Sequence, residues 1–161
     1  MAEDLLYSGT VGAAMEGRES LIPSMSVSAA AFKQPGSGKK YRPNFSSAAS
    51  ITLDLIKKFH ELNIDPKITL NLNVPNLPYN EIKEIKVTSL GSWGARNPPN
   101  SETLSSGGEQ YWITHRTNVP ENLKDTDIET LARGVVSLTP IGPRFLAKEF
   151  SKELSNWVKA L

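Results

Sequence analysis

The chain has 161 residues, which is the usual length of one domain and is enough to bury a core. Apolar residues make up 39% and charged residues 22%, so the composition is that of a folded protein and excludes a disordered tail. The net charge is +1 without a basic block, which indicates neither polymeric nucleic acid nor a membrane surface as a partner.

The absence of cysteine excludes disulfides, thiolate metal sites and cysteine nucleophiles, and it fits a reducing compartment. The chain starts with the acidic residues Glu3 and Asp4, and no apolar run approaches the roughly 20 residues of a membrane span. We therefore expect a cytoplasmic protein with no secretory signal.

The first predicted element is a helix that begins after Ser8-Gly9-Thr10 and ends near Gly17. Val11, Ala14 and Met15 lie at helical spacing, and either Ser8 or Thr10 can serve as the N-cap. The stretch "PSMSVS" then alternates and predicts a short strand with Met25 and Val27 on one face. Residues 33–45 are rich in Gly, Pro and Lys and predict a loop.

A second helix is predicted from about Ser46 to Leu62, capped by Ser46 or Ser47. Its expected apolar stripe consists of Ala49, Leu53, Ile56 and His60, with Leu55, Phe59 and Leu62 beside it. Two strands follow. In 68–77, the apolar face is formed by Ile68, Leu70, Leu72 and Val74, and in 81–91 it is formed by Ile82, Ile85 and Val87.

The segment 92–108 is rich in Gly, Pro, Asn and Ser, and it predicts an extended excursion from which "EQYWITHR" returns as a strand. Residues 117–133 read as irregular or weakly helical, and "GVVSLTPI" predicts a strand that Pro140 ends. The last segment predicts a helix with one wide apolar stripe, formed by Leu146, Phe150, Leu154, Trp157 and Leu161.

Ser8-Gly9-Thr10 is the strongest candidate for chemistry. The N–H groups at a helix start point outward and the helix dipole favours negative charge there, so the corner can hold a phosphate. Glycine allows a ligand close to the backbone, and the two hydroxyls add donors. The alternative is an ordinary capped helix, which the pattern alone does not exclude.

Other candidates are weaker. "PGSGKK" is not a P-loop, because Lys33 stands where a Walker A motif needs glycine. His60 and His115 are isolated, so they do not predict a metal site. Asp125 and Asp127 are the nearest approach to paired carboxylates, and we expect both in a loop. The sequence favours a role as turn residue and a role as ligand equally for them.

A family likeness runs through nearly the whole chain. It is carried by "YSGTVGAAMEGR", "IPSMSVS", "LNLNVPNLP", "IKEIKVTSLG", "YWI" and "TDIETLARGVVSLTPI", in that order. These segments resemble the SurE proteins, the survival-protein family of metal-dependent 5′/3′-nucleotidases, from the middle of the family's sequence onward.

The resemblance implies an α/β fold, a SurE-like sandwich whose Rossmann-like N-terminal part is largely missing here. One SurE-like domain over 1–161 is expected, with a β-hairpin excursion at about 92–116 and a C-terminal helix at about 144–161. Upstream β-α units would supply parallel strands as neighbours of Met25 and Val27. The family's metal ligands are an Asp-Asp pair, a serine and an asparagine, and none has a matching position in this chain.

The resemblance also implies a function. The parent enzyme would hydrolyse nucleoside monophosphates with a divalent metal, Mg²⁺ or Mn²⁺, and would form a homodimer or homotetramer. Ser8, Gly9 and Thr10 match the family's contacts to the substrate phosphate. We expect this chain alone to bind no metal and to be inactive. The alternative is a non-catalytic oligomerisation or interaction module, or an inactive fragment.

Overall fold

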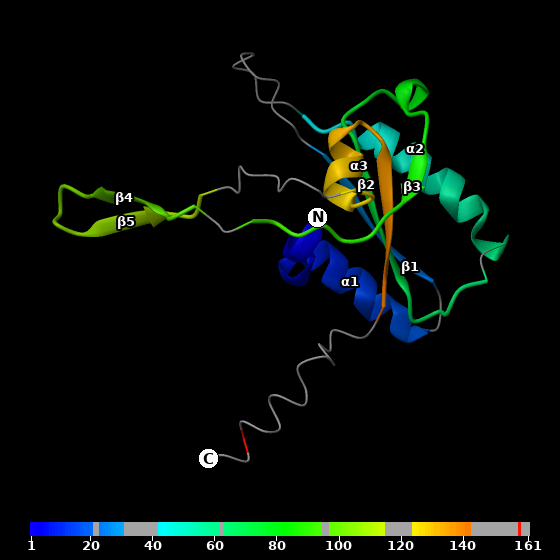
Figure 1. Ribbon diagram of the computed structural model, residues 1–161, viewed down its shortest axis with the longest axis horizontal. Coiled ribbons are helices and arrows are strands. Elements are labelled where there is room, and N and C mark those ends of the chain that lie inside the picture. Colours follow the sequence, from blue (N-terminus) through cyan, green and yellow to red (C-terminus); the bar gives the residue numbers. More distant parts are fainter. Residues whose placement is uncertain are drawn as a thin grey trace.

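The computed structural model of the chain describes residues 1–20, 23–30, 42–61, 63–94, 97–114, 124–142 and Val158. Its centre is a mixed four-stranded sheet in the order β1-β2-β6-β3 (Figure 1). The strands are β1 (Ser24–Ala29), β2 (Thr69–Val74), β3 (Ile85–Val87) and β6 (Val136–Ile141). β1 runs parallel to β2 and β3 runs parallel to β6, whereas β2 and β6 are antiparallel. The predicted α/β class is confirmed.

Helices cover both faces of this sheet (Figure 1). α2 (Phe45–Lys57) lies on one face, and α1 (Gly9–Gly17) and α3 (Asp127–Ala132) lie on the other. Short 3-10 helices occupy Ala2–Tyr7, Arg18–Ser20, Phe59–Glu61 and Tyr79–Glu81. We call Ala2–Tyr7, which runs directly into α1, the leading turn. The predicted helix end at Gly17 is confirmed.

The apolar core lies between α2 and the sheet, and a smaller cluster lies beneath α1. The larger cluster consists of Ala48, Ile51, Leu72, Val74 and Val136. The smaller one joins Leu5 of the leading turn to Val11 of α1 and Ile141 of β6. The leading turn and α1 are therefore fixed to the sheet by side-chain packing.

The other face of β2 is polar, and it is buried as completely as the apolar face. Thr69, Asn71 and Asn73 are 0–4% exposed. Hydroxyls on the adjacent strands supply partners: Ser24 Oγ to Thr69 Oγ1 at 2.9 Å, Ser26 Oγ to Asn71 Oδ1 at 2.7 Å, and Asn73 Nδ2 to Ser137 Oγ at 3.2 Å. These side chains can be buried because each has a hydrogen-bond partner.

The second helix differs from the prediction at its start and in its buried face. Asn44 is the N-cap, because its side chain accepts from the Ser47 amide at 3.1 Å, so the expected caps Ser46 and Ser47 are wrong. Ser47 instead lies buried inside the helix. The helix proper ends at Lys57, and Phe59–Glu61 continues as a 3-10 turn.

The buried stripe of α2 is formed by Ala48 and Ile51, with Leu55 beside them. Three members of the expected stripe are exposed, Ala49, Leu53 (57%) and Ile56 (50%), so that prediction is wrong for these positions. The side chain of His60, its fourth member, lies outside the described residues. The reason is that apolar residues surround much of this helix, and its sequence does not select which ones face the sheet. The exposed ones continue into an apolar groove beside β1, lined by Val27, Ala29, Phe45, Ala48, Ala49, Thr52 and Leu53.

The cap assignment has a measurable consequence. Asn44→Ala should lower the free energy of unfolding by about 1 kcal/mol, because the Ser47 amide loses its acceptor. Ser46→Ala should cost less, since Ser46 only donates a hydrogen bond to the Asn44 side chain. Denaturant unfolding of both variants measures the two losses of unfolding free energy. Equal losses would contradict the assignment of Asn44 as the cap.

β1 has a ladder partner, β2, on one side only within the part of the chain that the structure describes. The parallel neighbour of Met25 and Val27 is thus a strand that follows them in the chain, and the upstream strands that the family likeness implies remain a prediction. β3 is an edge strand, and its apolar residues Ile85 and Val87 are 37% and 68% exposed. The face that carries Ile85 and Val87 therefore lies at the margin of the core. Ile82, just before the strand, packs against the larger apolar cluster.

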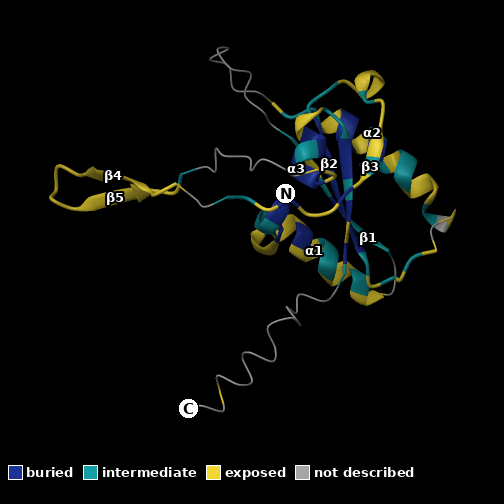
Figure 2. Cartoon of the chain, in the orientation of Figure 1, coloured by how far each residue is buried: buried dark blue, intermediate teal, exposed yellow. Residues whose placement is uncertain are grey.

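A two-stranded hairpin projects from the body (Figure 1). It consists of β4 (Asn100–Thr103) and β5 (Glu109–Trp112), which pair antiparallel, and we call residues 97–114 the arm. Both strands are exposed along their whole length (Figure 2). The tip turns at Gly107, whose φ of 83° favours glycine.

β6 runs through Pro140 to Ile141, so the prediction that Pro140 ends the strand is wrong. β3 pairs with β6 only as far as Leu138, so Pro140 has a neighbouring strand, β2, on one side alone. On the open side, no strand needs the backbone N–H that proline lacks. Apart from Val158, the expected C-terminal helix at 144–161 lies outside the described residues, as does His115. Across the described ranges, no helix has both the length and the apolar character needed to cross a membrane.

Candidate phosphate-binding site

Ser8 forms the corner at which the leading turn becomes α1. Its backbone is extended, with φ −84° and ψ 116°, and its Oγ accepts from the Val11 amide at 3.3 Å. The Ser8 carbonyl also accepts from the Gly12 amide at 2.9 Å. Of the two predicted caps, Ser8 is therefore the N-cap and Thr10 is not.

The corner is open toward solvent. Gly9 and Thr10 are exposed, and a Cβ built on Gly9 would meet nothing within 4 Å. The Ser8 and Val11 amides are used inside the corner, on the Leu5 carbonyl and on Ser8 Oγ. Within the described ranges, no hydrogen bond occupies the Gly9 or Thr10 amide, so both can donate to a ligand.

The side chains add to this capacity. A serine hydroxyl has one proton and two lone pairs, so Ser8 Oγ can accept from Val11 and still donate its own proton. Thr10 presents a second hydroxyl one residue into the helix. Two amides, two hydroxyls and the positive end of the helix dipole suit one tetrahedral oxyanion.

Taken together, the fold and this corner define an α/β protein with a solvent-exposed helix start at which two amides and two hydroxyls are available as donors. Residues 1–97 match the family model described as "Survival protein SurE". The chain belongs to the SurE family.

Named relatives agree with this assignment. The chain is 37% identical to "5'-nucleotidase SurE" of Haemophilus ducreyi, over 97% of this chain and 61% of that protein. It is 32% identical to "5'-nucleotidase SurE" of Mannheimia succiniciproducens, over 99% of this chain and 61% of that protein. The crystal structure of the SurE protein from Aquifex aeolicus matches with a TM-score of 0.76 and 32% identity, over 98% of this chain and 60% of that one. The chain thus spans about three-fifths of the length of these relatives.

Asp125 and Asp127, the candidate pair of carboxylates, lie in different environments. Asp125 lies in the turn before α3 with φ 61°, a left-handed conformation in which Asp is enriched. Asp127 is the first residue of α3 and is fully buried, so its expected place in a loop is wrong. Thr126 is the N-cap of this helix, because its Oγ1 accepts from the Glu129 amide at 3.4 Å. The order Thr-x-x-Glu in "TDIE" is a signal of a helix start from which this place of Asp127 could have been predicted.

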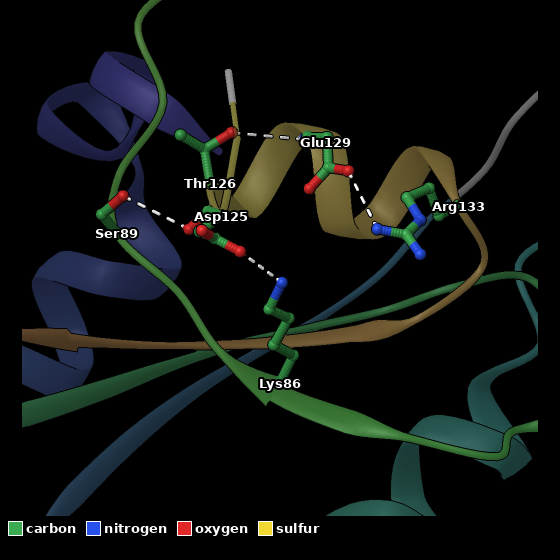
Figure 3. Close-up of polar contacts among 6 residues, drawn as sticks. All are labelled: Lys86, Ser89, Asp125, Thr126, Glu129 and Arg133. Atoms are coloured by element: carbon green, nitrogen blue, oxygen red, sulfur yellow. Dashed lines mark hydrogen bonds and ion pairs between the residues drawn. The ribbon is translucent and has the colours of Figure 1, made fainter. Parts of the chain in front are cut away.

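Asp125 belongs to a network of paired charges (Figure 3). Lys86 on β3 donates to Asp125 Oδ1 at 2.5 Å, and along α3 Arg133 pairs with Glu129 at 3.1 Å. The hydrogen bond from Lys86 holds the pKa of Asp125 below its usual value, and the same bond raises the pKa of Lys86. The contact between Lys86 and Asp125 fixes the start of α3 to β3, whereas Glu129 and Arg133 pair along the helix itself.

This ion pair predicts a pH dependence of stability. Because the pKa of Asp125 is lowered by folding, its contribution is present above its unfolded value, about 3.9, and is lost as the pH falls through the folded value. Because the pKa of Lys86 is raised, its contribution is lost as the pH rises through its folded value, above about 10.4. Asp125→Asn should therefore flatten the acid limb of unfolding free energy against pH.

Chemical unfolding between pH 3 and 7 measures this effect, which is small because the pair is partly exposed. Glu102→Gln, on the exposed arm, is the matched control and should leave the acid limb unchanged. An acid limb of the same slope in Asp125→Asn and in the unmodified chain would contradict the assignment.

The described residues do not form a metal centre. No three of their His, Asp or Glu side chains come together as possible ligands. Glu3, in the leading turn, is engaged elsewhere: its carboxylate accepts from Ser92 Oγ and from the Trp93 amide.

Proposed function

We propose that this chain is the phosphate-binding part of a SurE-type nucleotidase and that Ser8, Gly9 and Thr10 hold the phosphoryl group of a nucleoside monophosphate. The exposed helix start at Ser8, with its unused Gly9 and Thr10 amides, is the observation that carries the proposal. The name 5'-nucleotidase, which the relatives carry, supports phosphate monoesters as the ligand class.

In this proposal, the corner both binds and stabilises charge. The Gly9 and Thr10 amides and the Ser8 and Thr10 hydroxyls donate to the phosphoryl oxygens. Donors that are already oriented stabilise negative charge as it develops, without reorganising during the reaction. The family's divalent metal would supply the activation of water. That part of the chemistry falls to residues other than the described ones.

We expect the 161-residue chain by itself to bind phosphate weakly and not to hydrolyse AMP. The experiment is calorimetric titration with inorganic phosphate and 5′-AMP, beside a phosphate-release assay with Mn²⁺ or Mg²⁺. Binding without release is the expected result. One-to-one Mn²⁺ binding with release of phosphate would show that the chain supplies its own ligands. Absence of any phosphate binding would contradict the function proposed for the corner.

A second candidate function is that of an assembly module, and the arm favours it. Tyr111 and Ile113 are 60% and 79% exposed on or next to β5, and Trp112 between them is 43% exposed. Such residues are the usual anchors of protein interfaces. Sedimentation of the unmodified chain and of a variant with Trp112→Ser and Ile113→Ser tests this function. A homodimer or homotetramer that dissociates in the variant supports assembly through the arm.

We also propose that the protein is located in the cytoplasm, which the absence of cysteine supports.

A further inference from the structure

The carboxylate of Asp127 is the one fully buried charged side chain among the described residues. It accepts three backbone N–H groups from three separate segments. Its Oδ2 accepts from Ala2 at 2.8 Å, and its Oδ1 accepts from Gly91 at 2.8 Å and from Ile128 at 2.9 Å. A buried carboxylate is tolerated only with such charge-assisted bonds. The three segments are consequently held at one point.

α3 gives this carboxylate a fixed position. The Asp127 amide donates to the Ser89 carbonyl at 2.9 Å, and the Ser89 amide donates to the Asp125 carbonyl at 3.1 Å. Lys86 pairs with Asp125 from the neighbouring strand (Figure 3). The start of α3 is thus held against the end of β3 on both sides of Asp127.

One segment that Asp127 holds is the leading turn. Ala2 is fully buried and has φ 48°, a left-handed conformation that is unfavourable for alanine and needs support from its surroundings. The turn that it begins ends at Ser8, whose amide donates to the Leu5 carbonyl at 3.1 Å. The position of Ser8 therefore depends on α1, which follows it, and on the leading turn, whose first residue is held by the bond between Ala2 and Asp127.

The other segment comprises residues 91–93, which we call the base of the arm because they precede it in the chain. A Cβ on Gly91 would lie 2.8 Å from Ile128 Cδ1 and 3.2 Å from Asp127 Oδ1, so glycine permits this close approach. Directly after it, Glu3 accepts from the Trp93 amide at 2.8 Å and from Ser92 Oγ, and the Trp93 indole donates to the Met1 carbonyl at 3.4 Å. The leading turn and the arm base are thus tied twice, through Asp127 and through Glu3.

We propose that Asp127 is a positioning residue for the phosphate corner: its Oδ2 fixes the turn that leads into Ser8, and its Oδ1 couples that turn to the base of the arm. Loss of the Oδ2 bond frees Ala2 from its left-handed conformation, loosens the leading turn and misplaces the donors of the corner. The part of this inference that concerns phosphate rests on the proposed function, whereas the coupling of the two segments does not.

Asp127→Asn in the full 161-residue chain tests the inference. An asparagine can keep Oδ1 toward Gly91 and Ile128, while its NH₂ group then faces the Ala2 N–H, donor against donor. We expect amide exchange of residues 2–8, followed by NMR, to accelerate at least tenfold, and the Kd for inorganic phosphate to rise at least tenfold. Thr126→Ala is the matched control. It weakens the same helix by removing the cap bond to Glu129, and it leaves the carboxylate in place.

The outcomes separate the inference from the proposed function. If Asp127→Asn and Thr126→Ala lower the melting temperature alike and neither changes exchange in residues 2–8, Asp127 is a structural residue only and the inference is overturned. If the unmodified chain binds no phosphate, the proposed function fails, and faster exchange in Asp127→Asn alone still supports the coupling. Should Asp127→Asn not fold, Glu3→Ala removes the second tie and must accelerate exchange in both residues 2–8 and 92–93. If exchange accelerates in neither segment, the coupling is overturned.

Discussion

Replacing Ser8 and Thr10 together with alanine is expected to weaken phosphate binding by the chain at least tenfold. Each hydroxyl would donate to a charged oxygen, and such a bond contributes about 1.5–3 kcal/mol. The loss of the Ser8 cap lowers the free energy of unfolding by only about 1 kcal/mol, because it removes a single acceptor from the Val11 amide. Binding should therefore fall more than stability does.

Calorimetric titration with inorganic phosphate, beside thermal unfolding, measures the two effects. Thr52→Ala is the control, since its hydroxyl donates to the Ala48 carbonyl within α2, far from the corner in the sequence. It should alter stability slightly and leave phosphate affinity unchanged. If the double variant keeps its phosphate affinity and has a lower melting temperature, Ser8 and Thr10 only stabilise the helix start and do not bind phosphate.

Leu72→Ala is expected to lower the free energy of unfolding by about 2–5 kcal/mol. Leu72 is fully buried on β2, between β1 and β6, and belongs to the cluster that holds α2 on the sheet. Alanine would leave a cavity that the paired strands on both sides cannot close. Denaturant unfolding gives the loss, provided that the transition remains two-state.

Leu53→Ala is the matched control for this prediction. Leu53 is 57% exposed on α2, so its removal takes little apolar surface out of the core, and alanine favours the helix. We expect a change below about 1 kcal/mol. Equal losses at positions 72 and 53 would mean that the exposed face of α2 is covered in solution, for example by a second molecule at the groove beside β1.

Local patterns predicted several elements correctly because the necessary information lies within a few residues. A serine before a run at helical spacing predicted α1, with Ser8 as one of two candidate caps, and two-residue alternation predicted β1 and β2. The buried face of α2 could not be predicted in this way. Apolar residues surround much of that helix, so contact with the sheet, and not helical spacing, selects Ala48 and Ile51 over Leu53 and Ile56.

The sequence by itself determined the class of fold, the family likeness and the exposed corner at Ser8, because each depends on neighbouring residues or on a long contiguous motif. Only the tertiary structure decided which polar side chains are buried and which residues, far away in the chain, are their hydrogen-bond partners. Asn71 and Asn73 alternate with leucines in a way that marks a strand, but their burial depends on Ser26 and Ser137, which lie 45 and 64 positions away. Asp127 likewise becomes a point of attachment only because folding brings Ala2 and Gly91, 125 and 36 positions away, within hydrogen-bond distance. A buried polar group is stable only where its partners are, and partners from distant segments are placed by the packing of the whole sheet and its helices.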